Sequence, residues 1–242
     1  MLVSVTVLHY QPLARLRAFG NMGRVLLQPI TAPGLRFAKL MGSGIDFGMM
    51  PDLARYVFLG VWEDEISART FFQTTDFEQF TAGTTHTETL WLRPLQAHGL
   101  WDGQNPFREE MRNEGNTFVA SASENPGGEP RKLNLDGGPS ENCIAVLTRA
   151  TIRPRALPDF WRHVPQARAR LRAHADDLLF GIGIGELPLV QQCTVSVWRN
   201  AEAVNKYAYR ESGHREVVKL TRERKWYSEE LFARFAVVGW DR

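Results

Sequence analysis

The chain has 242 residues, of which 43% are hydrophobic and 23% are charged. This balance excludes a disordered chain, and the length suits one large hydrophobic core or two small ones. A formal net charge of +2 gives no reason to expect nucleic acid as a partner. The sequence has no uncharged apolar run long enough to cross a bilayer and no signal-peptide pattern at its N-terminus, so we expect a cytoplasmic protein.

The first part of the chain alternates between strand and helix patterns. Runs rich in β-branched residues predict strands, and apolar residues at helical spacing predict helices. The strands are expected at 2–10, 35–44, 55–62 and 84–92, and the helices at 13–27 and 63–80. This β-α-β-β-α-β order is that of a ferredoxin-like unit, the split βαβ motif.

The composition changes from Gln96 to about Ser140, where Gly, Pro, Asn, Glu and Ser are frequent and apolar residues are few. Such a composition is typical of a linker that is partly disordered. We therefore divide the chain into a first unit at 1–95, a linker at 96–141 and a second unit at 142–242.

The second unit repeats the order of the first. Strands are expected at 143–152, 179–185, 191–198 and 231–240, and helices at 157–174 and from residue 202 onward. The units also align in sequence, because GVWEDEISARTFF and SVWRNAEAVNKYA match at Trp62 and Trp198. Each unit should form a four-stranded antiparallel sheet with helices on one face, which leaves the other face to be covered. We therefore predict an α+β fold in which tandem ferredoxin-like repeats pack face to face as a pseudo-symmetric dimeric α/β-barrel.

One histidine of the second unit is a candidate metal ligand. On a helix, Val217 and Val218 share the face of His214, which directs the imidazole toward the sheet. A neutral imidazole there could hold haem iron. A histidine beside two valines also suits a hydrogen-bonded core position, so both interpretations stay open from the residues alone.

A second histidine competes for this role. His163 lies in DFWRHVP, with Trp161 beside it and Pro165 two residues further on. The proline favours a helix bend, and a surface histidine at a bend would explain His163 equally well. The remaining histidines show no metal-ligand spacing, which disfavours zinc hydrolysis and non-haem iron chemistry.

The predicted strand at 179–185 has glycine at every second position, at Gly181, Gly183 and Gly185. The stretch GIGIGE lacks the continuation of a dinucleotide-binding loop and is followed by a proline turn, so a Rossmann motif is excluded. Alternating glycines would let something large and flat approach the sheet closely. A β-bulge or close helix packing would explain them as well.

Other side chains on the predicted strands are weaker candidates. Lys39 and Arg149 could pair with carboxylates of a cofactor, or they could be solvated charges at strand ends. The further strand residues that could line a pocket are Ser43, Thr151, Gln191 and Ser196. The two cysteines, at positions 143 and 193, are expected to be reduced and buried, and Cys193 has no basic neighbour that would favour a thiolate ligand.

Several motifs in order carry a resemblance to a known family. They are LRFAKLMGSG, RYVFLGVWED, VLTRATIRP, GIGIGELPLVQQCTVSVW and KWYSEELFARFAVVG. With these motifs the chain resembles the spheroidene monooxygenase family of carotenoid biosynthesis over nearly its whole length, apart from about 108–141. It also resembles, more distantly, the tandem ferredoxin-like haem proteins that include aldoxime dehydratases and chlorite dismutases.

The resemblance implies an oxygenase that contains haem b and introduces a keto group into an acyclic carotenoid. Such an enzyme uses dioxygen and an electron donor such as ferredoxin. In the distant relatives a helix histidine holds haem between the sheet and helices of the second unit, which makes His214 the expected ligand and His163 the next. The oxygen-binding face would then include Gly183 and Gly185, with Gln191 and Ser196 as the catalytic candidates.

Two other functions stay open from the sequence. The same scaffold supports a haem dehydratase or peroxidase, and it could also be a cofactor-free ligand-binding module. Because a carotenoid would have to leave a membrane, transient membrane contact is compatible with the sequence although no anchor is visible. A homo-oligomer is compatible with it too.

Overall fold

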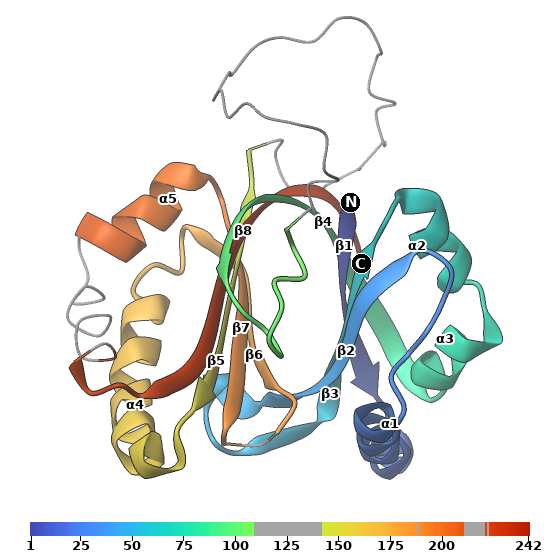
Figure 1. The fold of residues 1–242 in the computed structure, drawn as a ribbon, viewed down its shortest axis with the longest axis horizontal. Helices are drawn as coiled ribbons and strands as arrows, with labels where there is room; N and C mark the ends of the chain where they lie inside the picture. Colours follow the sequence, from blue (N-terminus) through green and yellow to red (C-terminus); the bar gives the residue numbers. More distant parts are fainter. Residues whose placement is uncertain (109–141, 188, 211–220, 222) are drawn as a thin grey trace, which may run out of the picture.

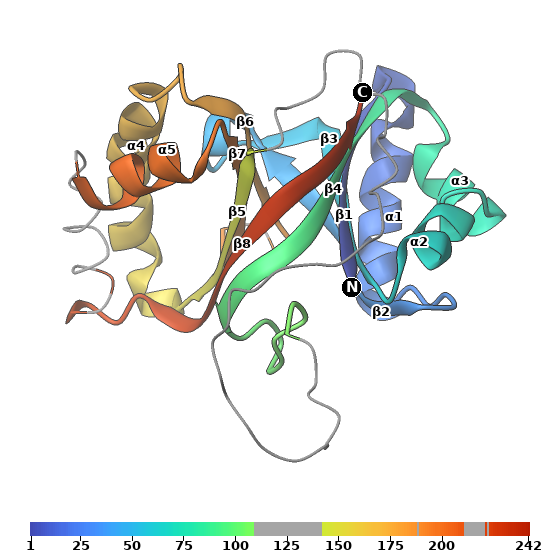
Figure 2. The same cartoon turned by 90° about the horizontal axis from the view of Figure 1, so that it is seen from above.

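The computed structural model describes residues 1–108, 142–187, 189–210, 221 and 223–242. Eight antiparallel strands form a closed barrel in the order β1-β3-β2-β6-β7-β5-β8-β4 (Figures 1 and 2). The strands are β1 Leu2–Tyr10, β2 Leu35–Gly44, β3 Pro51–Trp62, β4 Thr84–Gly99, β5 Ile144–Ile152, β6 Leu178–Gly185, β7 Gln191–Trp198 and β8 Tyr227–Asp241. The prediction of an antiparallel barrel built from two four-stranded halves is therefore confirmed.

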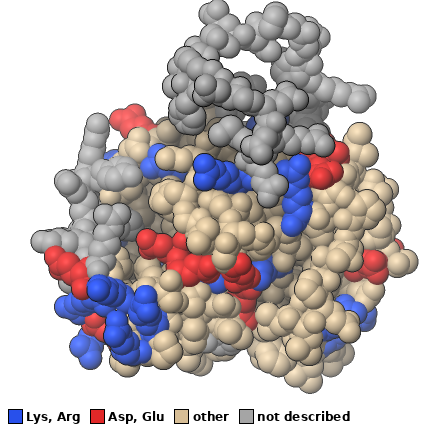
Figure 3. Space-filling model, viewed as in Figure 1, with Lys and Arg blue, Asp and Glu red and all other residues tan. Residues whose placement is uncertain are grey.

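Helices cover the barrel from two sides, as Figure 2 shows. The helices are α1 Arg15–Leu27, α2 Glu65–Phe71, α3 Thr75–Thr81, α4 Leu157–Arg172 and α5 Ala201–Asn205. The first three lie on the side of β1 to β4, and α4 and α5 lie on the side of β5 to β8. Lys and Arg side chains gather over α4 in Figure 3. Within the described residues, no helix combines the length and apolar character needed to cross a bilayer.

The two halves meet at two unequal seams. Between β4 and β8, ten residue pairs run from Thr89↔Asp241 to Gly99↔Leu231. Between β2 and β6 there are only two pairs, Gly42↔Gly185 and Ser43↔Ile184. We call the contact between β2 and β6 the short seam. It joins the two halves by fewer backbone pairs than the contact between β4 and β8 does.

The inside of the barrel is filled by apolar side chains. Strand residues alternate between the inside and the helix side, as the pleat requires. Val5, Leu59, Val195 and Phe235 belong to one interior cluster of buried side chains. Both cysteines are buried and belong to this cluster as well.

The two halves share local devices at matching positions. Trp62 Nε1 donates to the Ser4 hydroxyl of β1 and Trp198 Nε1 donates to the Ser196 hydroxyl of β7, each at 2.9 Å, so the tryptophans match in position although the serines do not. Two residues after each tryptophan, Asp64 and Asn200 cap the following helix by accepting a hydrogen bond from a backbone N–H. These pairs agree with the predicted alignment at Trp62 and Trp198; a tandem duplication stays a prediction.

Several elements differ from the prediction, among them β3, which begins at Pro51, and β8, which begins at Tyr227. The expected helix at 63–80 is divided into α2 and α3, because Thr74 is extended and its side chain caps α3. Strand β4 continues to Gly99, inside the predicted linker. The expected long helix from residue 202 begins as α5 and a π-helical turn at Lys206–Arg210, and the described chain stops there. Helix α4 continues through Pro165.

Candidate functional site

The helix-facing surface of the second half is poorly covered in its middle. One row of residues crosses its four strands in register, and it consists of Gly183, Thr194, Thr148 and Phe232. We call these four residues the second row. Thr148 is exposed although β5 is flanked by β7 and β8, and α4 buries none of its residues. Among the described residues, the helix layer therefore leaves this surface partly uncovered.

The matching row of the first half is closed. By the alignment at the tryptophans, it consists of Leu40, Phe58, Thr6 and Thr89. All four side chains are buried, and Phe58 packs against phenylalanines of α2 and α3. The second half thus has glycine in place of Leu40 and threonine in place of Phe58. At the other end of the row Phe232 takes the place of Thr89, so the side chains are smaller only at the β6 and β7 positions.

Apolar residues flank the second row at both ends. One cluster surrounds Trp198 and includes Val146 and Val204, and another surrounds Trp226 and includes Ile152. Along β5, Thr148 lies between Val146 and Ile152. The second row therefore has apolar clusters on two sides, small or polar residues at Gly183, Thr194 and Thr148, and a bulky residue, Phe232, at its β8 end.

The group that lies against the glycines of β6 is the side chain and backbone of Phe47. A Cβ atom on Gly183 would lie 3.0 Å from Phe47 Cα, and a Cβ on Gly181 would lie 3.0 Å from Phe47 Cζ. Phe47 is in a turn between β2 and β3 with positive φ at Asp46 and Phe47. The Asp46 carboxylate pairs with Arg168 and Arg172 of α4, which ties this turn to the second half.

Gly183→Ala should lower the free energy of unfolding by about 1–3 kcal/mol, because the new methyl group meets the Phe47 backbone. Gly181→Ala is the matched control. Its methyl group meets only the far end of the Phe47 ring, which can move away, so we expect a loss below about 1 kcal/mol. Urea unfolding of both variants measures the difference. Equal losses would contradict the close approach of Phe47 to Gly183.

Lys39 and Arg149 pair with the chain's own carboxylates. Lys39 Nζ lies 2.5 Å from Glu186 Oε2, and Arg149 is bound to Glu229. Asp102 accepts hydrogen bonds from both cations. Arg149 is only 3% exposed, so the expectation of a solvated charge is wrong for it. Its burial is possible because acidic groups from two other segments converge on the guanidinium.

The charged side chains around Lys39 and Glu229 stabilise each other's charged forms. Burial lowers the pKa of Lys39, but hydrogen bonds to Asp102 and Glu186 outweigh burial, and the pKa is raised overall. Burial raises the pKa of Glu229, but backbone N–H groups of Gly103 and Asp102 outweigh it, and the pKa is lowered overall. Both groups therefore stay charged at neutral pH.

Cys193 is unsuited to act as a thiolate ligand. It belongs to the barrel interior, on the opposite face of β7 from Thr194. Burial raises the pKa of its thiol, and the nearby Glu186 carboxylate raises it further. The uncharged thiol is therefore the stable form.

The predicted catalytic residues have contacts inside the protein. The Ser196 hydroxyl accepts a hydrogen bond from Trp198 Nε1 at 2.9 Å and donates to the Val146 carbonyl at 3.5 Å. The Gln191 carbonyl oxygen occupies the space that a Cβ on Gly185 would need, at 2.2 Å. The Ser196 hydroxyl therefore stabilises the fold, as the Ser4 hydroxyl does by accepting a hydrogen bond from Trp62.

His163 is half-buried on α4. Its Nδ1 lies 2.8 Å from the Asp159 carbonyl oxygen and donates to it, which leaves Nε2 with the lone pair in the neutral ring. The ring lies 5.2 Å from that of Trp226. His214, Val217 and Val218 lie outside the described residues. Among the residues that are described, no three His, Cys, Asp or Glu side chains gather as a metal site.

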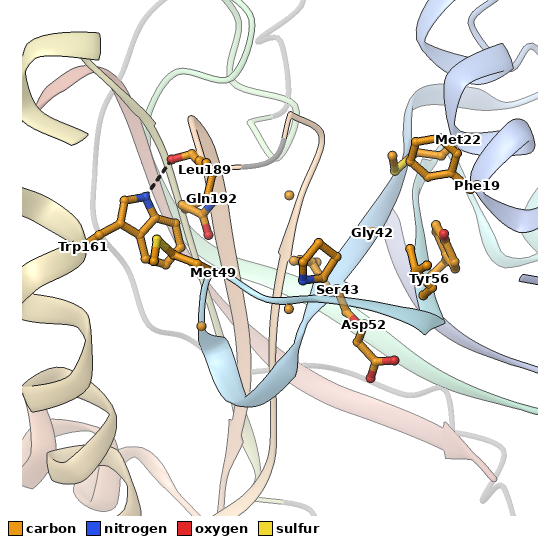
Figure 4. A pocket seen from close by; sticks show the side chains of 16 residues that line it. Phe19, Met22, Gly42, Ser43, Met49, Asp52, Tyr56, Trp161, Leu189 and Gln192 are labelled. Atoms are coloured by element: carbon orange, nitrogen blue, oxygen red, sulfur yellow. Dashed lines mark hydrogen bonds between the residues drawn. The ribbon is translucent and has the colours of Figure 1, made fainter. Parts of the chain in front are cut away.

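A separate cavity of about 120 Å³ lies at the short seam (Figure 4). Trp161 and Gly185 line it, as does the predicted pocket residue Ser43. Gln192 lines it in place of Gln191, and Tyr56 of β3 contributes as well. We call this space the seam cavity. No sequence motif indicates Tyr56 or Gln192, because the cavity that they line is formed by segments distant in the sequence.

Comparison with known proteins identifies the family. No family model matches the chain. It is 32% identical to the spheroidene monooxygenase of Rhodobacter capsulatus over 210 residues, which cover 86% of this chain and 77% of that one. The chain belongs to the spheroidene monooxygenase family. The resemblance inferred from the sequence motifs is thereby confirmed.

Two further members of the family show the same likeness. The spheroidene monooxygenase of Cereibacter sphaeroides is 33% identical over 229 residues, which cover 93% of this chain. This chain spans 63% of the length of that relative. The spheroidene monooxygenase of Rubrivivax gelatinosus is 30% identical over 228 residues, covering 93% of this chain and 77% of the relative.

Solved structures with a similar fold include aldoxime dehydratases. One crystal structure of aldoxime dehydratase superposes with a TM-score of 0.56 at 13% identity, covering 98% of this chain and 80% of that one. A second, a complex with butyraldoxime, has a TM-score of 0.54 at 11% identity, covering 98% and 79%. At these identities the likeness shows a shared fold.

Proposed function

We propose that the chain is a haem-dependent monooxygenase that oxidises an apolar, carotenoid-like substrate with dioxygen. Membership of the spheroidene monooxygenase family is the observation that carries the proposal. Dioxygen and an electron donor such as ferredoxin are the co-reactants that the proposal requires. Electrons are needed because a monooxygenase reduces the second oxygen atom of dioxygen to water.

The open middle of the second sheet fits a haem group. Haem is flat and mostly apolar, and it needs a space whose walls are apolar and whose floor carries no bulky side chains. Thr148 and Thr194 supply the floor, with Phe232 and Phe47 at its two edges, and the clusters around Trp198 and Trp226 supply the walls. In the first half, Phe58 and Leu40 are buried at the matching positions. We therefore place haem b in the second half.

His214 is the axial ligand in this proposal. Ala203 and Val204 of α5 pack on the helix-facing side of the second sheet, and the chain proceeds from α5 to His214 within about ten residues. When bound, haem supplies the oxidative chemistry, and the protein supplies orientation and a dry pocket. Thr148 and Thr194 offer hydroxyl groups on the floor that can hold or pass a proton, whereas the Ser196 hydroxyl is already engaged by Trp198.

The test combines absorption spectroscopy with isotope labelling. The purified chain, supplemented with haem, should show a Soret band and should transfer ¹⁸O from labelled dioxygen into an acyclic carotenoid. A Soret band with turnover but no ¹⁸O in the product would indicate a haem dehydratase or a peroxide-driven enzyme instead. No Soret band after supplementation would overturn every haem-dependent function and favour a ligand-binding module.

A further inference from the structure

Helix α1 presents apolar side chains to solvent. On its inner side, Ala18 and Met22 are buried in the core of the first half. On its outer side, Leu16 is 81% exposed and Leu27 is 86% exposed. Leu13, just before the helix, is 97% exposed. No described segment covers these side chains, although apolar groups of this size are usually removed from water.

The exposed residues form one stripe along the helix. The stripe consists of Leu16, Gly20, Gly23 and Leu27, which follow one another at spacings of three or four residues. A Cβ atom on either glycine would meet no atom within 4 Å, so the space outside the stripe is open. Phe19 and Leu26 lie along one side of the stripe and are both exposed. We call these six residues, together with Leu13, the α1 face.

Apolar side chains continue beyond α1. Phe19 lines the seam cavity at one end, and Met49 of the turn between β2 and β3 lines it at the other, as Figure 4 shows. Met49 and the adjacent Met50 are both exposed. Asp52 also lines the cavity, but its carboxylate is paired with Arg55 at 2.6 Å. A group of exposed apolar side chains of this extent marks an interaction surface.

The charges on α1 are all positive. The helix contains three arginines, and the range 1–45 contains no Asp or Glu. Arg17 and Arg24 are exposed, and helical spacing places them along the side of the stripe opposite to Phe19. Helix α3, which carries Asp76 and Glu78, contacts α1 on the side of Arg24 and so lies away from Phe19. The α1 face therefore has a basic border and no acidic residue of its own.

This combination favours an anionic membrane surface as the partner. A helix with exposed leucine and phenylalanine on one face and arginines beside it suits the plane of a bilayer interface. Its apolar side chains then enter the acyl region, while the arginines meet negatively charged headgroups. A second copy of the chain would bring the same arginines together, and like-charge repulsion disfavours that pairing.

We propose that the α1 face docks the protein on an anionic lipid bilayer, with α1 lying parallel to the membrane plane. This goes beyond the proposed function, because vesicle binding requires neither haem nor turnover. Docked in this way, the protein would hold the end of the seam cavity that Phe19 lines close to the membrane.

The test measures co-sedimentation of the purified chain with lipid vesicles. Vesicles of phosphatidylcholine and phosphatidylglycerol in equal parts are compared with vesicles of phosphatidylcholine alone. We expect stronger binding to the anionic vesicles, and high salt should remove the difference. Leu16→Ser with Leu27→Ser should lower binding to both kinds of vesicle about tenfold or more, because less apolar area enters the bilayer. Its circular dichroism spectrum should be unchanged, since both side chains are exposed.

Two single variants separate the contribution of charge from that of apolar area. Arg17→Gln should lower binding to the anionic vesicles about fivefold and leave binding to phosphatidylcholine unchanged, because one attraction to the headgroups is lost. Gly20→Leu should raise binding to both kinds of vesicle about tenfold, because its side chain enters open space and adds apolar area to the stripe.

Ile66 on α2 provides the matched control. Its side chain is 78% exposed, but Asp64 and Glu65 precede it at the start of that helix. An exposed apolar residue beside carboxylates should gain nothing from an anionic surface. Ile66→Ser should therefore leave binding to both kinds of vesicle unchanged.

The proposal is overturned if the unaltered chain binds anionic and neutral vesicles equally, if Leu16→Ser with Leu27→Ser binds as the unaltered chain does, or if Ile66→Ser weakens binding as much. Sedimentation velocity that shows a dimer, dissociated by the same double variant, would also overturn it and would make the α1 face an interface between two copies. A chain that binds vesicles but transfers no ¹⁸O would keep the membrane surface and lose the proposed function. One that transfers ¹⁸O without binding vesicles would do the reverse.

Discussion

Trp101→Ala should lower the free energy of unfolding by about 3–5 kcal/mol, the usual cost of removing a large aromatic side chain from a core. Trp101 is fully buried although it follows β4 in a stretch of linker-like composition. Its ring packs edge-on against Phe37 at 5.3 Å, and its Nε1 donates to Glu186 Oε1 at 2.7 Å. The truncation would leave both a void and a buried carboxylate with one donor fewer.

Urea unfolding monitored by circular dichroism measures this loss. Trp101→Phe is the matched control, because it keeps most of the ring and loses the hydrogen bond to Glu186, and we expect about half the effect. In Figure 1 the segment after β4, in green, turns back across the barrel. A loss below about 1 kcal/mol for Trp101→Ala would show that this segment adds little to the stability of the barrel.

His214→Ala should abolish haem retention and leave the fold intact. An axial imidazole provides the bond that holds haem b, which has no covalent link to the protein. The variant should therefore show no Soret band after haem supplementation and gel filtration, with an unchanged circular dichroism spectrum. His163→Ala, the control on α4, should retain haem.

The opposite pattern, with haem lost only from His163→Ala, would transfer the axial role to His163. The carbon monoxide adduct of the reduced protein reports the ligand independently. A band at the position typical of thiolate-bound haem would identify Cys193, against the burial that favours its uncharged thiol.

The strands could be predicted because their patterns are local. The ranges expected for β1, β2 and β7 coincide with those observed, since alternation of apolar residues follows from the pleat itself. The division between α2 and α3 depends on the single cap at Thr74, which helical periodicity does not reveal. Element order and barrel closure follow from the sequence, whereas helix ends depend on such side-chain contacts.

The candidate site was harder to predict, because its neighbours are distant in the sequence. The glycines of β6 indicated a close approach, but only the fold shows that Phe47 from the other half makes it. The composition after Gln96 indicated a linker, and it gave no sign that Trp101 would find Phe37 and Glu186. Arg149 is buried for the same reason, since Glu229 and Asp102 reach it from other segments.

The unequal seams have a mechanical consequence. Parting β2 from β6 breaks the backbone pairing of only two residue pairs, together with the ion pairs of Lys39 with Glu186 and of Asp46 with Arg168 and Arg172 and the contact of Phe47 with Gly183, while the ten pairs between β4 and β8 keep the halves attached. Local opening is easiest where the fewest backbone hydrogen bonds must be lost. The pairing of β4 with β8 can therefore act as a hinge. A ligand too wide for the closed barrel could enter between β2 and β6 without unfolding either half.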